Sequence, residues 1–228
     1  MTPGLFEYPK SAALGRILPK SKIYEHGSPT SAIKELFVRQ VEQIVWQFKL
    51  APETINLPPS RSVPEIQIFS VILREGEIKE DVLRLMDQSI PFPIFFEACY
   101  EDQIKAIAAY KRPSEADSTK WVVSDYFETA WFSQETPRTP LPIVLNLESL
   151  YASLLTSLMP FPIRSGEGLQ DFVVRMELFR SRQKELEKCE SRIKKEKQFN
   201  RKLKINSELR ELKREIETLT SSLPNLST

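Results

Sequence analysis

The side chains in this chain that could carry out a reaction are carboxylates and lysines rather than histidines or cysteines. The 228 residues include one histidine, His26, and two cysteines, Cys99 and Cys189. Ser-His-Asp and Cys-His catalysis both need a positioned imidazole, whereas His26 lies in a polar stretch typical of a solvated surface. A structural zinc site takes four Cys or His ligands, which these residues do not supply. None of the six glycines falls in a phosphate-binding loop pattern. We therefore expect no cofactor bound through such a loop and no metal site of this kind.

One reaction needs only carboxylates and a lysine, namely Mg²⁺-dependent cleavage of a phosphodiester. Glu65 opens an expected strand, Glu97 lies in a nearly continuous apolar stretch, and Lys105 and Lys111 lie on the following expected strand. A buried Glu97 would be costly without a partner or a metal. Restriction nucleases carry a lysine two residues after the acid on one strand, and here Cys99 occupies that position. This departure favours a structural ion pair for Glu97 and a protein that is not an enzyme. A nuclease-like enzyme, active or degenerate, that binds Mg²⁺ with Glu65, Glu97 and Lys105 or Lys111 is the alternative.

The remaining pattern up to residue 168 predicts an α+β body with a basic N-terminal arm. Apolar spacing indicates a helical turn over 14–18, helices over 32–50, 79–88 and 149–159, and strands over 66–74, 92–100, 103–111 and 121–131. The stretch 92–100 is apolar almost throughout, as in a central strand buried on both faces. The last three strands follow one another closely, which is typical of an antiparallel meander. We expect a mostly antiparallel sheet of three to four strands, covered by helices.

Residues 169–228 are predicted to form one long coiled-coil helix. The pattern from Ile205 onward has aliphatic residues at alternating spacings of four and three, at Ile205, Leu209, Leu212, Ile216, Leu219 and Leu223. We interpret a loss of phase near Asn200 as a change of register. Two such helices must meet, so we expect this interface to pair with a second copy or with a partner protein. Replacing Leu212 and Ile216 by aspartate should then abolish that association.

The charge of the chain is distributed unevenly. Residues 171–228 carry 15 Lys and Arg against 10 Asp and Glu, which leaves 17 against 21 for the first 170 residues. The densest basic stretch includes Arg192, Lys194, Lys195, Arg201, Lys202 and Lys204. These cations could neutralise nucleic-acid phosphates with strong salt dependence and little sequence preference. A solvated helix surface is the simpler interpretation. Phe199 among them is expected to pack on the body rather than to stack on a base.

The chain is expected to stay in the cytoplasm and away from membranes. No run approaches the roughly 18 apolar residues of a membrane span. Two isolated cysteines do not suggest a disulfide framework, and they are compatible with a reducing compartment.

Six short stretches, distributed over most of the chain, stand out together: LPKSKIY (18–24), VEQIVWQFKL (41–50), EIQIF (65–69), PFPIFFE (91–97), AYKR (109–112) and EKQFNRK (196–202). They resemble a bacterial domain family of unknown function whose genes lie beside helicase and DNA-methyltransferase genes in defence and restriction-modification loci. The resemblance implies a DNA-transaction context with a helicase or methyltransferase partner, and it supplies no catalytic residues. We therefore expect a non-catalytic accessory module that docks partner proteins, with nucleic acid as a candidate ligand. A structural homodimer is a further alternative.

Overall fold

The chain forms two compact units, which are described separately. The computed structural model describes residues 4–114, 116–117 and 120–221. The first unit ends at Met159 and the second begins at Pro160. Residues 160–168 therefore group with the C-terminal helices.

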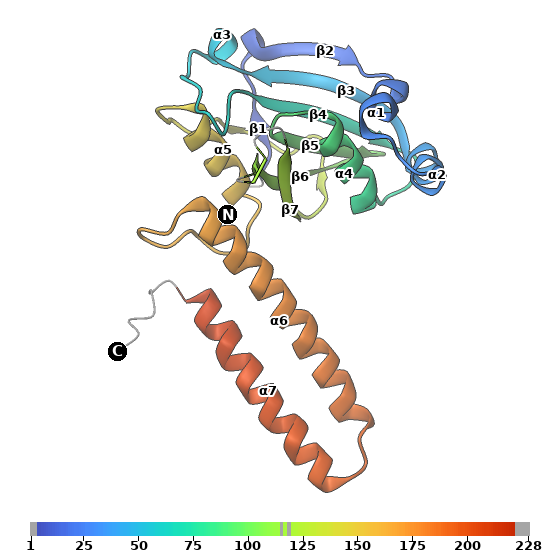
Figure 1. Cartoon of the computed structure of the whole chain (residues 1–228), viewed down its shortest axis with the longest axis vertical. Coiled ribbons are helices and arrows are strands. Elements are labelled where there is room, and N and C mark those ends of the chain that lie inside the picture. The colour runs from blue at the N-terminus through green and yellow to red at the C-terminus, as the bar shows by residue number, and fades with distance from the viewer. Residues whose placement is uncertain (1–3, 115, 118–119, 222–228) are drawn as a thin grey trace. The chain divides into compact units, whose positions relative to one another are not determined.

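The first unit is built on a seven-stranded mixed sheet (Figure 1). Its order is β2-β3-β4-β5-β6-β7, with β8 beside β6. The strands are β2 (Ala13–Ile17), β3 (Val41–Leu50), β4 (Ile66–Leu73), β5 (Ile94–Tyr100), β6 (Gln103–Pro113), β7 (Trp121–Glu128) and β8 (Phe132–Ser133). All neighbouring pairs are antiparallel except β4 with β5. The mostly antiparallel α+β class is confirmed, but the sheet has more strands than the three to four predicted.

Helices cover one face of this sheet and explain its single parallel pair. Helix α4 (Glu80–Ser89) connects β4 to β5, and such a crossover allows two strands to run in the same direction. It packs with α1 (Lys20–Gly27) and α2 (Ser31–Gln40) over an apolar core that includes Phe37, Met86 and Phe96. The predicted meander is present as β5, β6 and β7, and residues 94–98 of β5 are buried.

The remaining elements of the first unit are short. They are β1 (Phe6–Glu7), the 3-10 helix η1 (Lys10–Ala12), α3 (Pro52–Ile55), β9 (Thr139–Pro140) and α5 (Leu147–Thr156). Strands β1 and β9 form a separate parallel pair. This pair brings the N-terminal segment beside the segment that precedes α5.

Two predictions of local structure near the N-terminus are wrong. The expected helix over residues 32–50 ends at Gln40, and β3 begins at the next residue. Residues 41–50 are rich in β-branched and aromatic side chains, which favour a strand that pairs on both edges. The expected helical turn over 14–18 is instead β2, because these residues pair with β3.

The second unit is a helical hairpin and not one long helix. Helix α6 (Leu169–Lys195) and helix α7 (Phe199–Thr220) lie side by side and are joined by residues 196–198 (Figure 1). Cys189 of α6 packs with Ile205 and Leu209 of α7 in a small apolar cluster. The predicted coiled-coil interface therefore meets α6 of the same chain. Leu223, its last predicted member, lies outside the described residues.

Polar contacts hold both ends of the hairpin. In the connection, the Glu196 carboxylate accepts hydrogen bonds from the backbone N–H groups of Lys197 and Gln198, each at 2.9 Å. At the opposite end, buried Arg175 binds Glu167 through two hydrogen bonds of 2.6 and 2.7 Å and donates to the Leu219 carbonyl at 2.8 Å. A cation beside the last carbonyls of α7 also suits the helix dipole.

The described residues contain no helix with the combination of length and apolar character that crossing a membrane requires.

Candidate functional site

Glu97 on β5 pairs with an arginine, and its side chain points away from the helix-covered core. Its neighbours Phe96 and Ala98 belong to that core, so Glu97 lies on the other face of the sheet, where it is 4% exposed. Both guanidinium nitrogens of Arg138 donate to the Glu97 carboxylate, one of them at 3.0 Å. This pairing raises the pKa of Arg138, which also donates to the Phe6 carbonyl at 2.9 Å. The ion pair thus fastens the β1–β9 segments to the central strand.

Lys105 lies on the opposite face of the sheet from Glu97. It is paired in register with Ala98, one residue away from the position that would bring it beside the acid. Its ammonium donates to Glu128 at 2.7 Å and lies 5.0 Å from the centre of the Trp131 ring. Lys105 therefore belongs to a different ion pair.

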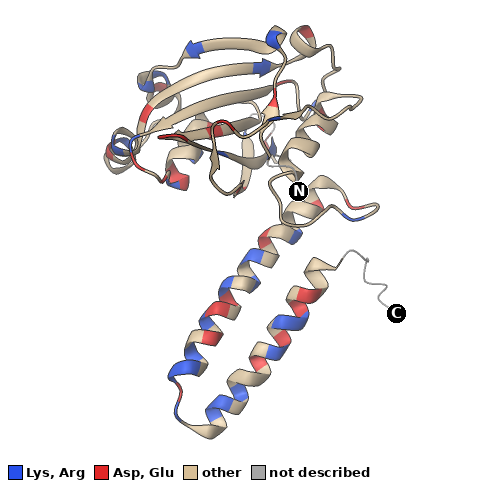
Figure 2. Ribbon diagram, turned by 180° about the vertical axis from the view of Figure 1, so that it is seen from behind, with Lys and Arg blue, Asp and Glu red and all other residues tan. Residues whose placement is uncertain are grey.

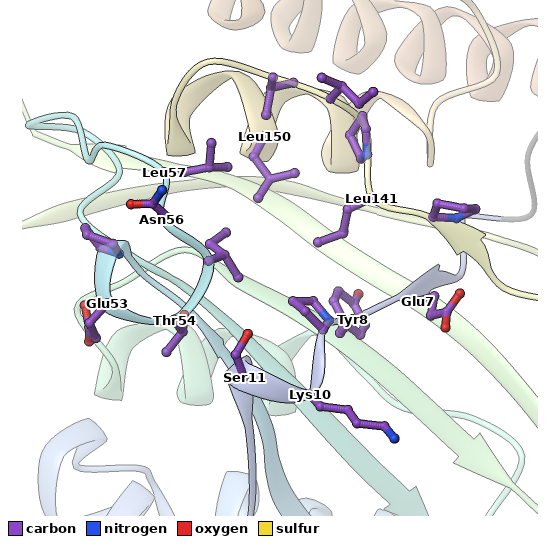
Figure 3. Close-up of a pocket in the computed structure, with 17 residues that line it drawn as sticks. Glu7, Tyr8, Lys10, Ser11, Glu53, Thr54, Asn56, Leu57, Leu141 and Leu150 are labelled. Carbon is purple, nitrogen blue, oxygen red and sulfur yellow. The ribbon is translucent and has the colours of Figure 1, made fainter.

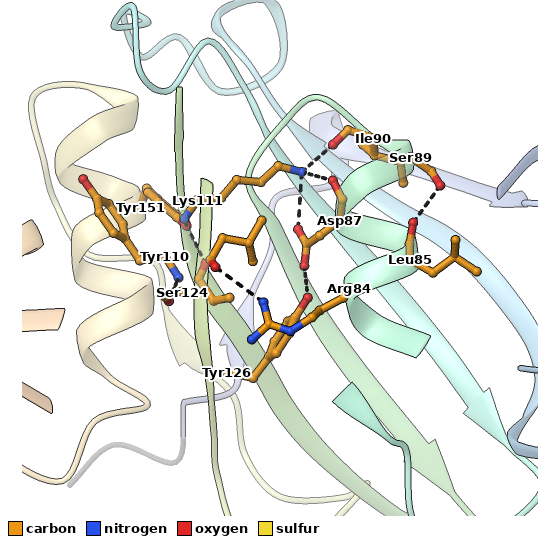
Figure 4. Close-up of polar contacts among 12 residues, drawn as sticks. Arg84, Leu85, Asp87, Ser89, Ile90, Tyr110, Lys111, Ser124, Tyr126 and Tyr151 are labelled. Carbon is orange, nitrogen blue, oxygen red and sulfur yellow. Dashed lines mark hydrogen bonds and ion pairs between the residues drawn. The ribbon is translucent and has the colours of Figure 1, made fainter. Parts of the chain in front are cut away.

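Lys111 is fully buried in a network that joins α4, α5, β6 and β7 (Figure 4). Its ammonium donates to the Asp87 side chain at 3.4 Å and to the Ile90 carbonyl, and the Tyr126 hydroxyl donates to Asp87. The backbone N–H of Lys111 donates to the Tyr151 hydroxyl at 2.8 Å. Burial raises the pKa of Asp87 and lowers that of Lys111, and their attraction opposes both shifts. Removing one member of such a buried pair is strongly destabilising, so Lys111 anchors the fold.

Glu65, the remaining predicted ligand, lies far from Glu97. Its carboxylate pairs with Lys49 at 3.1 Å. Glu97 is in register with Ser70 of β4, and Glu65 precedes Ser70 by five residues, or about 16 Å of extended strand. The four residues of the predicted nuclease site thus occupy four separate ion pairs. Within the described part of the chain, no three His, Cys, Asp or Glu residues are grouped to hold a metal.

A cavity of about 380 Å³ opens beside Glu97. The buried Tyr8 hydroxyl in its wall has no hydrogen-bond partner among the described residues, and burial raises the pKa of Tyr8 well above its usual value. Burial also raises the pKa of the Cys99 thiol, which lies 3.6 Å from the Ser70 hydroxyl. A thiol with a raised pKa is a poor nucleophile. The cavity can hold a small polar molecule, but no activated nucleophile lines it.

A wider cavity of about 760 Å³ lies along β1, η1, α3 and the segment after β9 (Figure 3). Pro9, Pro52 and Pro142 contribute to its wall together with Leu57 and Leu141. Mostly apolar walls with a few polar groups are typical of a binding cavity. Its mostly apolar wall distinguishes this cavity from the positively charged end of the hairpin, which is described next.

The predicted basic residues gather where the two helices of the second unit meet. We call residues 192–204 the hairpin tip. This segment contains seven cations and one acid. Figure 2 shows Lys and Arg of both helices concentrated there. Each of the six candidates is exposed: Arg192, Lys194, Lys195, Arg201, Lys202 and Lys204. The reversal of the chain at residues 196–198 therefore converts a linear run into one cationic surface.

A concave site of about 330 Å³ lies within the hairpin tip. Its wall consists of four cations, two acids and one apolar residue, namely Arg192, Lys195, Arg201, Lys204, Glu196, Glu208 and Ile205. Arg192 pairs with Glu208 at 3.3 Å. Hydrogen bonds from the backbone N–H groups of Gln198 and Lys197 stabilise the ionised Glu196 carboxylate and lower its pKa. The excess of cations gives a surface suited to a phosphate group.

A family model for a domain of unknown function, DUF4391, matches residues 6–216. The chain belongs to the DUF4391 family. The DUF4391 match takes in the sheet and the hairpin through Ile216, and it confirms the expected membership in a family of unknown function. No curated protein and no solved structure matches the chain.

Three features of this DUF4391 chain were not predicted from its sequence. Arg138, the partner of Glu97, lies 41 residues further along the chain, between the strand predicted over 121–131 and the helix predicted over 149–159. Nothing in the sequence around Tyr8, in the N-terminal segment, predicts that its side chain is buried in the wall of a cavity. The third is the position of Phe199 at the hairpin tip, where its side chain is 73% exposed, and its predicted packing on the body stays a prediction. The first two depend on the β1–β9 pairing, which two-residue strands do not reveal in sequence.

Proposed function

We propose that this DUF4391 protein is a non-catalytic accessory module of bacterial DNA transactions, and that its hairpin tip binds nucleic-acid phosphates. The observation that carries the proposal is the concave site lined by Arg192, Lys195, Arg201 and Lys204 from two helices. Phosphate contacts made by lysine and arginine provide affinity without sequence preference. The packed and ion-paired interior of the hairpin would hold these cations in fixed positions.

The body is the part that we propose docks a protein partner. Ile143, which lines the wider cavity, is fully exposed, and Leu145 is 86% exposed. Exposed aliphatic side chains favour protein contacts. A helicase or DNA methyltransferase, as the sequence resemblance suggests, is the proposed partner. A complex of this kind would present the hairpin tip to the nucleic acid on which the partner acts.

The test measures the affinity of the protein for a labelled duplex oligonucleotide at increasing salt concentrations, starting near 50 mM. In the tip variant, Lys194, Lys195, Arg201 and Lys202 are all replaced by glutamine, which preserves helix propensity. The logarithm of the binding constant falls with the logarithm of salt by about 0.9 per duplex phosphate neutralised. We therefore expect the tip variant to reduce that slope by about 3 to 4 if each cation meets one phosphate.

The matched control removes the same charge from the middle of the hairpin. It replaces Lys184, Arg210, Lys213 and Arg214, which are also exposed. Along their helices, Lys184 lies 10 residues from Lys194 and Arg210 lies 8 residues from Lys202, which is about 15 and 12 Å from the nearest replaced tip cation. Both distances exceed the Debye length of about 10 Å at 0.1 M salt, so the control should keep the parental slope. Equal effects of both variants, or no binding by the parent protein at 50 mM salt, would refute the proposal.

The nuclease-like alternative has one supporting observation, the polar cavity beside Glu97. It would require a metal held without Glu65, Lys105 or Lys111, since these residues make other ion pairs. The homodimer alternative would need a surface other than the Ile205–Leu209 cluster, which packs against α6. Neither alternative has an observation comparable to the cationic site at the hairpin tip.

A further inference from the structure

An exposed apolar pair lies among the cations of the hairpin tip. Phe199 is 73% exposed and Leu203 is 54% exposed, although both belong to a helix whose other face packs on α6. Residues four apart in a helix lie one above the other on the same side. The two side chains therefore form one apolar platform at the start of α7.

Cations border this platform on both sides. At about 100° per residue, Lys202 lies some 60° from Phe199 toward the packed face, and Lys204 lies about 100° beyond Leu203 on the other side. Both lysines are exposed. An exposed aromatic ring forgoes the free energy that burying its apolar surface would contribute. A flat apolar ring between two cations matches the structure of a nucleotide, which has a flat base between two phosphates.

We infer that the hairpin tip recognises unpaired nucleic-acid bases, with Phe199 as the stacking platform and Lys202 and Lys204 on the flanking phosphates. The inference rests on the proposed function and adds a substrate class to it. In duplex nucleic acid the faces of the bases are stacked on one another, so a ring on the protein surface reaches them only in single strands, loops and ends. Stacking on an aromatic side chain is tolerant of base identity. The chain thus binds single strands more tightly than duplex of equal length.

The experiment compares three labelled ligands of about 15 nucleotides, within the size range that single-strand binding sites occupy. They are oligo-dT, the same strand with abasic positions throughout, and a duplex. The full-length protein should bind oligo-dT more tightly than the abasic strand. Phe199→Ala should lower the affinity for oligo-dT by about 5- to 150-fold, the range for loss of one stacked base. It should leave the abasic strand and the duplex within about twofold.

Conservative variants separate stacking from simple apolar contact. Phe199→Trp should keep the preference for oligo-dT, whereas Phe199→Leu should lose it because leucine has no ring to stack. Ile17→Ala removes an apolar side chain of the first unit with a comparable exposure of 64% and should leave the affinity for all three ligands unchanged. Circular dichroism should confirm that each variant keeps the parental helix content.

Each outcome separates this inference from the function on which it rests. If the parent protein binds none of the three ligands, the proposed function fails together with the inference. If it binds all three with equal affinity and Phe199→Ala has no effect, the inference alone fails. Binding to phosphatidylserine vesicles that survives in Phe199→Leu, without binding to oligo-dT, would assign the platform to a membrane surface and overturn the inference.

Discussion

The residue that best illustrates local chemistry is Glu97, because its environment determines whether it can act as a metal ligand. A carboxylate that accepts two hydrogen bonds from one guanidinium is already neutralised. Arg138 remains about one third exposed, so water partly screens the pair. The arrangement stabilises the junction between β5 and the N-terminal segment without requiring a cation.

Replacing Glu97 by glutamine tests this role. The variant leaves Arg138 without its charged partner, and we expect a loss of about 2 kcal/mol in the free energy of unfolding, as for a hydrogen bond to a charged group. Melting temperatures should be measured with and without Mg²⁺ or Mn²⁺. Neither the parent protein nor the variant should respond to metal.

Glu135→Gln, a change at an exposed glutamate, is the control and should be neutral. A metal-dependent rise in the melting temperature of the parent, lost in Glu97→Gln, would instead support the nuclease-like alternative. That result would also require the Arg138 pair to open on metal binding.

At the scale of elements, the hairpin changes what the apolar pattern of α7 predicts. Leu212 and Ile216 were expected to hold two chains together, but α7 lies against α6. We now expect Leu212→Asp with Ile216→Asp to lower the stability of the hairpin by about 1–2 kcal/mol per site through lost apolar burial. Circular dichroism should show lower helix content on heating.

The mass of the particle in light scattering should not change in this double variant. Arg210→Asp with Arg214→Asp, on the exposed side of α7, provides the matched control. A change from dimer to monomer in the Leu212→Asp, Ile216→Asp variant would instead support the prediction that this surface is an intermolecular interface.

The Arg175–Glu167 contact, at the end of the hairpin opposite the connection, should make the stability of the hairpin depend on pH. Hydrogen bonds from Arg175 lower the pKa of Glu167 below its ordinary value of 4.5. A carboxyl with a lowered folded pKa contributes stability that is complete above about 4.5 and is lost as pH falls toward the folded value. The parent hairpin should therefore melt at lower temperature as pH falls from 6 to 3.

Glu167→Gln should weaken this dependence on pH and reduce the stability at pH 6. The comparison variant is Glu211→Gln, which changes an exposed glutamate of the same hairpin. Parallel pH profiles for the parent and Glu167→Gln would show that the Arg175 contact adds no stability.

At the scale of the whole molecule, the charged residues of the two units have different roles, although the net charge is only +1. The few charged side chains that are buried in the first unit are paired, as Asp87 of α4 is with Lys111 of β6. The hairpin tip instead leaves its cations on the surface. Only such exposed cations can exchange their counterions for the phosphates of a ligand.

The sequence by itself determined the features that depend on neighbouring residues. Residues 92–100 and 103–111 were identified as adjacent antiparallel strands because apolar runs and a short polar turn are local signals. The apolar periodicity of α7 and its basic run were likewise visible. The register of β5 and β6 was not, and a shift of one residue decides whether Lys105 meets Glu97.

Tertiary structure decided the features that depend on distant residues. The strand β3 followed α2 without a Pro or Gly to separate them, and pairing with β2 and β4 overrode the helical pattern. Arg138 met Glu97 because β9 pairs with β1. The loss of phase near Asn200 marked a chain reversal and not a register change, since α7 finds its apolar partner in α6. That reversal alone brings Arg192 and Lys204 into one site, because cations 12 residues apart on a straight helix would be about 18 Å apart.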